Sequence, residues 1–179
     1  SNTRFFDRCL GWEGLLIDAN PKMYDITNSN RPYAHRMNFA PACDNPGETI
    51  KFAATKFSNS GLVGYAKEFD KHQHIHVDIP CGPLSPVLED VFMDRETKIN
   101  FFSLDVEASE ELVLNTIDFE KIHIDVLMVE VECENSRVKN TCSMRERIRA
   151  KMYNAGYTIY TGIVPRSDVY LHPSSPFKI

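Results

Sequence analysis

The chain has 179 residues, 42% of them hydrophobic and 25% charged, a composition that fits one globular domain and excludes a disordered or fibrous protein. Its apolar runs are far shorter than the ~20 residues needed to cross a bilayer, so no membrane span is predicted. The net charge of -5 is unfavourable for contact with a phosphate backbone, and we therefore expect no nucleic-acid partner.

The first quarter of the chain predicts a helix, a strand and a second helix. Apolar residues at helical spacing predict a helix over 5–10, which Gly11 ends. The apolar run 14–18 has the length of a strand. Asn20 and Pro21 then have the residue types of a helix N-cap and a first helical residue.

The middle of the chain is less regular. Strands are expected at 33–39 and 48–53, with a turn-rich cluster between them. The stretch 55–71 lacks periodicity and predicts a surface loop or lid. A strand at 74–79 follows, and then a short helix at 83–92.

The second half alternates strands and helices again. A strand at 99–105 precedes a helix that Ser109 is expected to cap, and a strand at 123–131 precedes a helix at 140–154. The tail predicts two closing antiparallel strands, 157–164 and 168–172. This alternation predicts an α/β fold, with one doubly wound, mainly parallel sheet in a single domain over residues 1–179.

Acidic residues stand at the ends of three predicted strands, namely Asp18, Asp105 with Glu107, and Glu130 with Glu132. Ligands of open α/β sheets bind beyond the carboxyl ends of the strands. An ionised acid at such a position can accept hydrogen bonds from both ribose hydroxyls of a nucleotide, which suits Asp18. The alternative is that these acids only cap helices or lie in solvated turns.

Two segments resemble FkbM-type methyltransferases. The stretch 10–21, LGWEGLLIDANP, is similar to the LGW-x-GLLIE-x-NP stretch of that family, and 102–114, FSLDVEASEELVL, to its SLDVEG-x-E---VL block. Shorter likenesses at 126–130 and 156–170 extend the resemblance over nearly the whole chain. The resemblance implies a class I methyltransferase, Rossmann-like fold, S-adenosylmethionine as cofactor, and O-methylation of a small-molecule or glycan acceptor.

The resemblance also implies roles for individual residues. Asp18 is expected to bind the cofactor ribose, and Asp105 or Glu107 to be the base that removes the acceptor proton. Capping of the helix that follows is the structural alternative for Asp105. The remaining expected cofactor contacts are Asn20 and Pro21 in the turn, Ala40, Pro41 and Ala42 near the adenine, and Ser103 and Leu104 at the rim.

Two departures from the family pattern leave alternatives open. The glycine-loop element of the family falls upstream of Ser1, so we expect an N-terminally incomplete domain that lacks its first strand. Ala108 stands where the family usually has Gly, and its methyl group disfavours a positive φ. The alternatives are a catalytically inactive domain of the same fold that binds a protein partner, and another nucleotide-binding α/β enzyme.

Other candidate features have more ordinary interpretations. His72, His74 and His76 share one face of a predicted strand, but no further ligand accompanies them, so we interpret them as solvent-facing and expect no metal. Trp12 is either a stacking platform for a ligand or, as we prefer, part of a buried corner between helix and strand.

Five cysteines without a C-x-x-C pair argue against a zinc ribbon. Their odd number fits reduced thiols better than a full disulfide framework, which favours the cytoplasm without deciding the compartment. Two pairings stay open for a secreted protein, Cys43 with Cys81 and Cys133 with Cys142.

Overall fold

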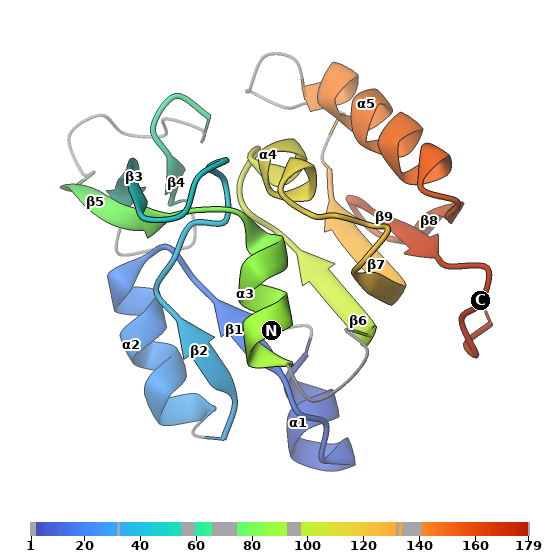
Figure 1. Cartoon of the computed structure of the whole chain (residues 1–179), viewed down its shortest axis with the longest axis horizontal. Helices are drawn as coiled ribbons and strands as arrows, with labels where there is room; N and C mark the ends of the chain where they lie inside the picture. Colours follow the sequence, from blue (N-terminus) through green and yellow to red (C-terminus); the bar gives the residue numbers. More distant parts are fainter. Residues whose placement is uncertain are drawn as a thin grey trace.

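The computed structural model describes residues 3–31, 33–54, 60–65, 75–92, 98–131, 133 and 141–178. It is a mixed α/β fold in which helices surround several small sheets (Figure 1). None of the helices in these residues is long and apolar enough to cross a membrane. In chain order the elements are α1 (Arg4–Leu10), β1 (Leu15–Ile17), α2 (Pro21–Asn30), β2 (His35–Met37), β3 (Glu48–Ala54), β4 (Gly61–Leu62), β5 (Ile75–Cys81), α3 (Leu84–Val91), β6 (Lys98–Leu104), α4 (Glu110–Asn115), β7 (His123–Glu130), α5 (Thr141–Asn154), β8 (Thr158–Val164) and β9 (Ser167–Leu171).

The first sheet is the parallel pair β1–β2, which α2 connects. Helix α1 ends at Gly11, whose φ of 67° is the left-handed conformation that a C-terminal glycine adopts without strain. Asn20 caps α2 by accepting a hydrogen bond from the backbone N–H of Lys22, and Pro21 is the first helical residue. The predicted end of the first helix at Gly11 and the predicted start of the second at Asn20 and Pro21 are therefore confirmed.

The second sheet, β4-β3-β5, is antiparallel throughout and separate from the other two. The sequence predicts one mainly parallel sheet, so this arrangement is a correction. Both β3 and β5 keep several exposed residues, as strands with one solvated face do, whereas parallel strands are usually covered on both faces. Strand β4 falls within the stretch predicted to be a loop. His76 is exposed, and His72 and His74 lie outside the described residues.

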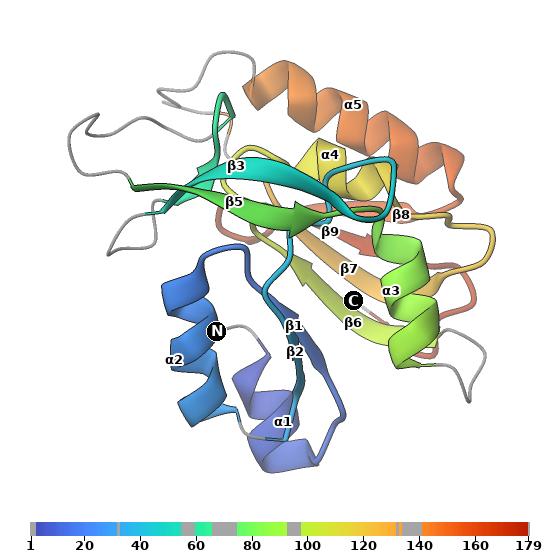
Figure 2. The ribbon, with the colours of Figure 1, turned by 60° about the vertical axis from the view of Figure 1, so that its left-hand side comes forward.

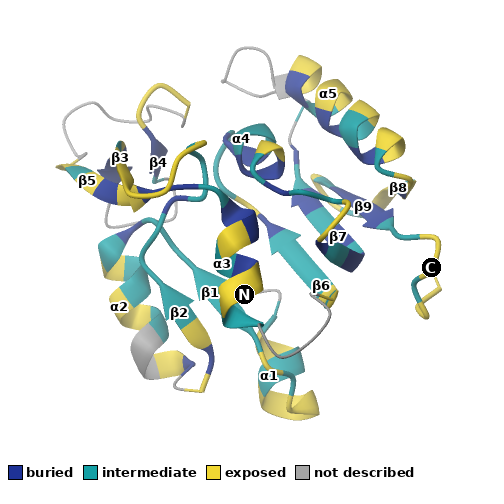
Figure 3. Ribbon diagram, viewed as in Figure 1, coloured by how far each residue is buried: buried dark blue, intermediate teal, exposed yellow. Residues whose placement is uncertain are grey.

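The third sheet has the order β6-β7-β9-β8, with β6 and β7 parallel and the hairpin β8–β9 antiparallel to β7. The predicted closing hairpin is thus confirmed. Helices α4 and α5 lie over one side of this sheet, above β7 and β9 (Figure 2). The buried residues of this sheet concentrate on β7 and β9, and the faces of α4 and α5 that turn toward the sheet are buried as well (Figure 3). The core includes Leu104, Val113, Leu114, Ile124, Leu127, Val129, Ile148, Met152 and Tyr170.

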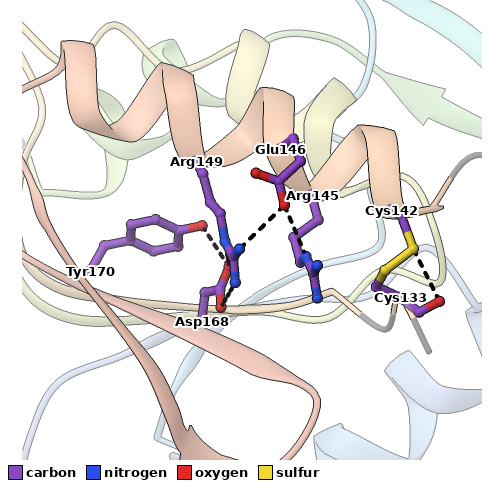
Figure 4. A network of polar contacts seen from close by, with 7 residues as sticks. All are labelled: Cys133, Cys142, Arg145, Glu146, Arg149, Asp168 and Tyr170. Carbon is purple, nitrogen blue, oxygen red and sulfur yellow. Dashed lines mark hydrogen bonds and ion pairs between the residues drawn. A yellow bond between two sulfur atoms is a disulfide. The ribbon is translucent and has the colours of Figure 1, made fainter.

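Helix α5 carries the predicted apolar face, with Met144, Ile148 and Met152 buried. It begins at Thr141, so Ser143 lies inside its first turn and not at its start. The three arginines of α5 are paired with acids, as Arg149 is with Asp168 on β9 (Figure 4).

Four of the five cysteines form disulfides, Cys43–Cys81 and Cys133–Cys142, while Cys9 is free and exposed. Both pairings that the sequence leaves open are therefore made, and the interpretation of the odd count as reduced thiols is wrong for these four. Disulfides persist in oxidising compartments, so the reason for favouring the cytoplasm is removed.

Candidate functional site

A cavity of about 790 Å³ lies between the β1–β2 pair and β6. All residues of β1 and β6 contribute to its walls, and within the described residues β1 pairs only with β2 and β6 only with β7. Each of these two strands therefore has an edge without a strand partner. The cavity extends from the carboxyl ends of both strands to α1.

The cavity gathers nearly all the site residues expected from the sequence. Asp18 and Asp105, which follow β1 and β6, both line it although the two strands do not pair. Pro21 is the exception, because it begins α2 outside the wall. The other expected residues in the wall are Asn20, Ala40, Pro41, Ala42, Ser103, Leu104 and Glu107.

The turn after β1 holds the Asp18 carboxylate in place. Its Oδ1 accepts a hydrogen bond of 2.8 Å from the backbone N–H of Asn20, and its Oδ2 accepts none from the residues that the structure describes. Burial raises the pKa of Asp18, and the hydrogen bond from Asn20 opposes this rise. A ligand hydroxyl that donates to Oδ2 would stabilise the ionised form in this half-buried setting.

The part of the wall formed by residues 40–42 is tied to the end of β5. The Ala40 backbone N–H donates to the Pro80 carbonyl oxygen at 2.9 Å, and Ala40 forms a parallel bridge with Cys81. The disulfide Cys43–Cys81 fastens the same segment covalently. The small side chains of Ala40, Pro41 and Ala42 therefore line the cavity on a backbone that is fixed to β5.

The turn after β6 has unusual backbone geometry. Glu107 and Ala108 have φ values of 51° and 70°, in the left-handed region that residues with a Cβ rarely adopt. The Val106 backbone N–H donates to Glu110 Oε1 at 3.0 Å, and burial is the main cause that raises the pKa of Glu110 to about 7. Ala108 therefore takes the conformation that its methyl group disfavours. This positive φ explains why a glycine would suit this position better.

We expect Ala108→Gly to raise the free energy of unfolding by about 1 kcal/mol, because glycine adopts the left-handed conformation without a Cβ clash. The matched control is Ala150→Gly on the exposed face of α5, where the same change should cost about 1 kcal/mol of helix stability. Urea unfolding measures both. A loss of stability at both positions would contradict this account of the turn.

Ser109 differs from its expected role as a helix cap. Its side chain makes no capping hydrogen bond to α4, and its Oγ is buried without a hydrogen-bond partner among the described residues. The residue is only 2% exposed, and it lines the cavity. A buried hydroxyl without a partner is costly, and a bound ligand is one group that can satisfy it.

Aromatic residues line the other end of the cavity. The rings of Phe6 and Trp12 are stacked with centroids 4.7 Å apart, and the rings of Phe6 and Phe101 are 5.1 Å apart. Trp12 is thus part of the predicted corner between helix and strand, and it also faces the cavity. The sequence gives no signal for the contact with Phe101, which comes from a distant strand.

The described residues contain no group of three or more His, Cys, Asp or Glu side chains arranged to hold a metal ion. No curated protein and no solved structure matches the chain. The model of the methyltransferase FkbM domain matches residues 1–159, which include β1, β6 and both acidic strand ends of the cavity. Because this match covers most of the sequence, the chain belongs to the methyltransferase FkbM domain family.

Proposed function

We propose that the protein is an S-adenosylmethionine-dependent methyltransferase that methylates a hydroxyl oxygen of a small molecule or glycan. Family membership indicates a methyltransferase. The observation that carries the proposal is that Asp18 and Asp105, at two separate strand ends, face one cavity. This is where open α/β sheets bind nucleotide-like ligands.

The residues present fit the adenosyl group of this cofactor. The volume lies within the range of roughly 300–1,000 Å³ that is usual for small-molecule pockets. Asp18 would accept the ribose hydroxyls, with Asn20 shaping the turn, and residues 40–42 would lie beside the adenine. Ser103 and Leu104 would form the rim near the reacting group. When bound, the cofactor supplies an electrophilic methyl group.

The acceptor proton needs a base at the same rim. Asp105 and Glu107 are the candidates, because both line the cavity beside Ser103. Transfer of a methyl group from sulfur to oxygen requires mainly that the acceptor be aligned and its proton removed. A small molecule or a terminal sugar suits a cavity of this size.

Isothermal titration calorimetry of the protein with S-adenosylhomocysteine tests the proposal. We expect micromolar binding, and at least a tenfold loss of affinity in Asp18→Asn, because that change removes charge-assisted hydrogen bonds. Asp25→Asn on the exposed face of α2 is the matched control and should bind normally. Complete absence of binding to the wild-type protein would overturn the enzyme proposal. It would favour an inactive domain of the same fold that binds a protein partner.

A further inference from the structure

A second acid lies behind the cavity wall, next to Asp105. Strands β6 and β7 are parallel neighbours in which Leu104 is opposite Val129, so the residues that follow, Asp105 and Glu130, lie side by side. The two carboxyl groups are close enough for a hydrogen bond between them, which is one cause of the raised pKa of Glu130. Asp105 lines the cavity and Glu130 does not. A bound ligand would therefore contact Asp105, and Glu130 would contact Asp105 from outside the cavity.

A hydrogen bond between two carboxyl groups requires a proton on one of them. Burial, the hydrogen bond with Asp105 and the charges of Asp105 and Glu107 raise the pKa of Glu130 to about 7. Arg166, on the turn between β8 and β9, opposes the rise from 4.0 Å and is itself largely exposed. The proton is therefore gained and lost close to neutral pH.

Two independent features of the same turn point to a ligand beside Asp105. Ser109 keeps a buried hydroxyl without a partner among the described residues, and it lines the cavity. Glu107 and Ala108 hold positive φ values, a kind of backbone strain that concentrates at ligand-binding and active sites. The carboxyl pair thus lies at a turn whose geometry is not explained by packing alone.

We propose that Glu130 is a positioning residue that shares one proton with Asp105, so that the acid–base group facing the cavity is a carboxyl pair and not Asp105 alone. The inference rests on the proposed function for its chemical role. As the acceptor oxygen bonds to the methyl carbon and the carbon–sulfur bonding pair stays on sulfur, the hydroxyl proton passes to Asp105 and is shared with Glu130. A pair that binds a proton near neutral pH is a better base than an ordinary carboxylate.

Carboxyl-carbon NMR titration tests the pair directly and needs no substrate. In the wild-type protein we expect the signals of Asp105 and Glu130 to move together near pH 7. In Glu130→Gln the step near neutral pH should be lost, because the partner that binds the shared proton is gone. In Asp105→Asn the pKa of Glu130 should fall toward its ordinary value. Independent titration of the two signals in the wild-type protein would overturn the proposal, even if a variant failed to fold.

Glu110 provides the matched control, because its pKa is also raised to about 7 but its carboxylate bonds to the Val106 backbone. Glu110→Gln should leave the joint titration of Asp105 and Glu130 near neutral pH. If the joint titration step is absent in Glu110→Gln, the proton near neutral pH belongs to Glu110 and the proposal fails. The signals of all three acids must therefore be assigned residue by residue.

Calorimetry with S-adenosylhomocysteine on the same samples separates this inference from the proposed function. We expect Glu130→Gln to bind S-adenosylhomocysteine within about twofold of the wild type, because Glu130 lies outside the cavity wall. If the wild-type protein binds S-adenosylhomocysteine but its Asp105 and Glu130 signals titrate independently, only the inference of a carboxyl pair is overturned. A shared proton without any binding would overturn the methyltransferase proposal and, with it, the chemical role of the pair.

Discussion

Replacing both cysteines of the Cys43–Cys81 disulfide by alanine is expected to lower the free energy of unfolding by about 4 kcal/mol. The bridge spans a sequence separation of 38, and loop-closure entropy alone gives a stabilisation of about 4 kcal/mol for a loop of that size. Cys81 is fully buried against Phe52 and Ile79, so the contacts that its sulfur makes there are not replaced by contacts with water in the variant. Denaturant unfolding of the oxidised proteins measures the difference.

The control is the corresponding change in the Cys133–Cys142 disulfide. That bridge spans a separation of only 9, and Cys142 is exposed, so we expect a smaller loss, about 2.5 kcal/mol. The Cys43–Cys81 variant should also bind S-adenosylhomocysteine more weakly, because the bridge fastens the wall at residues 40–42. Equal losses from the two bridges, with unchanged binding, would contradict this role for Cys43–Cys81.

The second large effect is expected from Asp168→Asn, which should cost about 3 kcal/mol because it removes the buried carboxylate that is the counter-ion of the half-buried Arg149. Arg149 donates from Nε and Nη2 to the two carboxylate oxygens of Asp168 at 2.8 and 2.9 Å (Figure 4). The Asp168 side chain is 5% exposed, and Tyr170 Oη donates to the same carboxylate. Burial raises the pKa of Tyr170, which keeps its hydroxyl protonated as a donor. The pair fastens α5 to β9.

Glu111→Gln is the matched control for this pair. Arg147 bonds Glu111 with the same two-pronged geometry, at 2.6 Å for each contact, but the Arg147 side chain is 56% exposed. Water and salt screen an exposed pair, so the change should have a slight effect that disappears at high ionic strength. Thermal or urea unfolding at low and high salt compares the two. A similar cost at both positions would show that burial does not govern the Arg149–Asp168 contribution.

Local signals predicted several elements correctly because their causes are local. Gly11 and Gly156 end helices through positive φ values of 67° and 88°, which need only the absence of a side chain. Asn20 and Pro21 begin α2 because the cap bonds to the next turn of the same helix. The same signal failed at Ser109, which makes no capping hydrogen bond and whose φ of -113° and ψ of 12° are not the extended conformation typical of an N-cap.

Long-range pairing was not predictable in the same way. The strand patterns at β3 and β5 were recognised, but an alternation of exposed and buried residues does not tell which strand is the neighbour. The cysteine count likewise could not tell whether Cys43 and Cys81 approach each other. Both outcomes depend on contacts between segments far apart in the chain, which compete through packing and loop closure.

The sequence alone determined the order of helices and strands apart from β4, the acids after β1 and β6, and the likeness to the FkbM family, since each depends on residues close together in the chain. Only the tertiary structure decided that the strands form three sheets, that Asp18 and Asp105 face one cavity, and that Glu130 lies beside Asp105. These features arise where strand edges and side chains from separate segments meet. Backbone hydrogen bonding and burial over the whole fold decide which strand edges and side chains come into contact, and no local sequence pattern encodes those contacts.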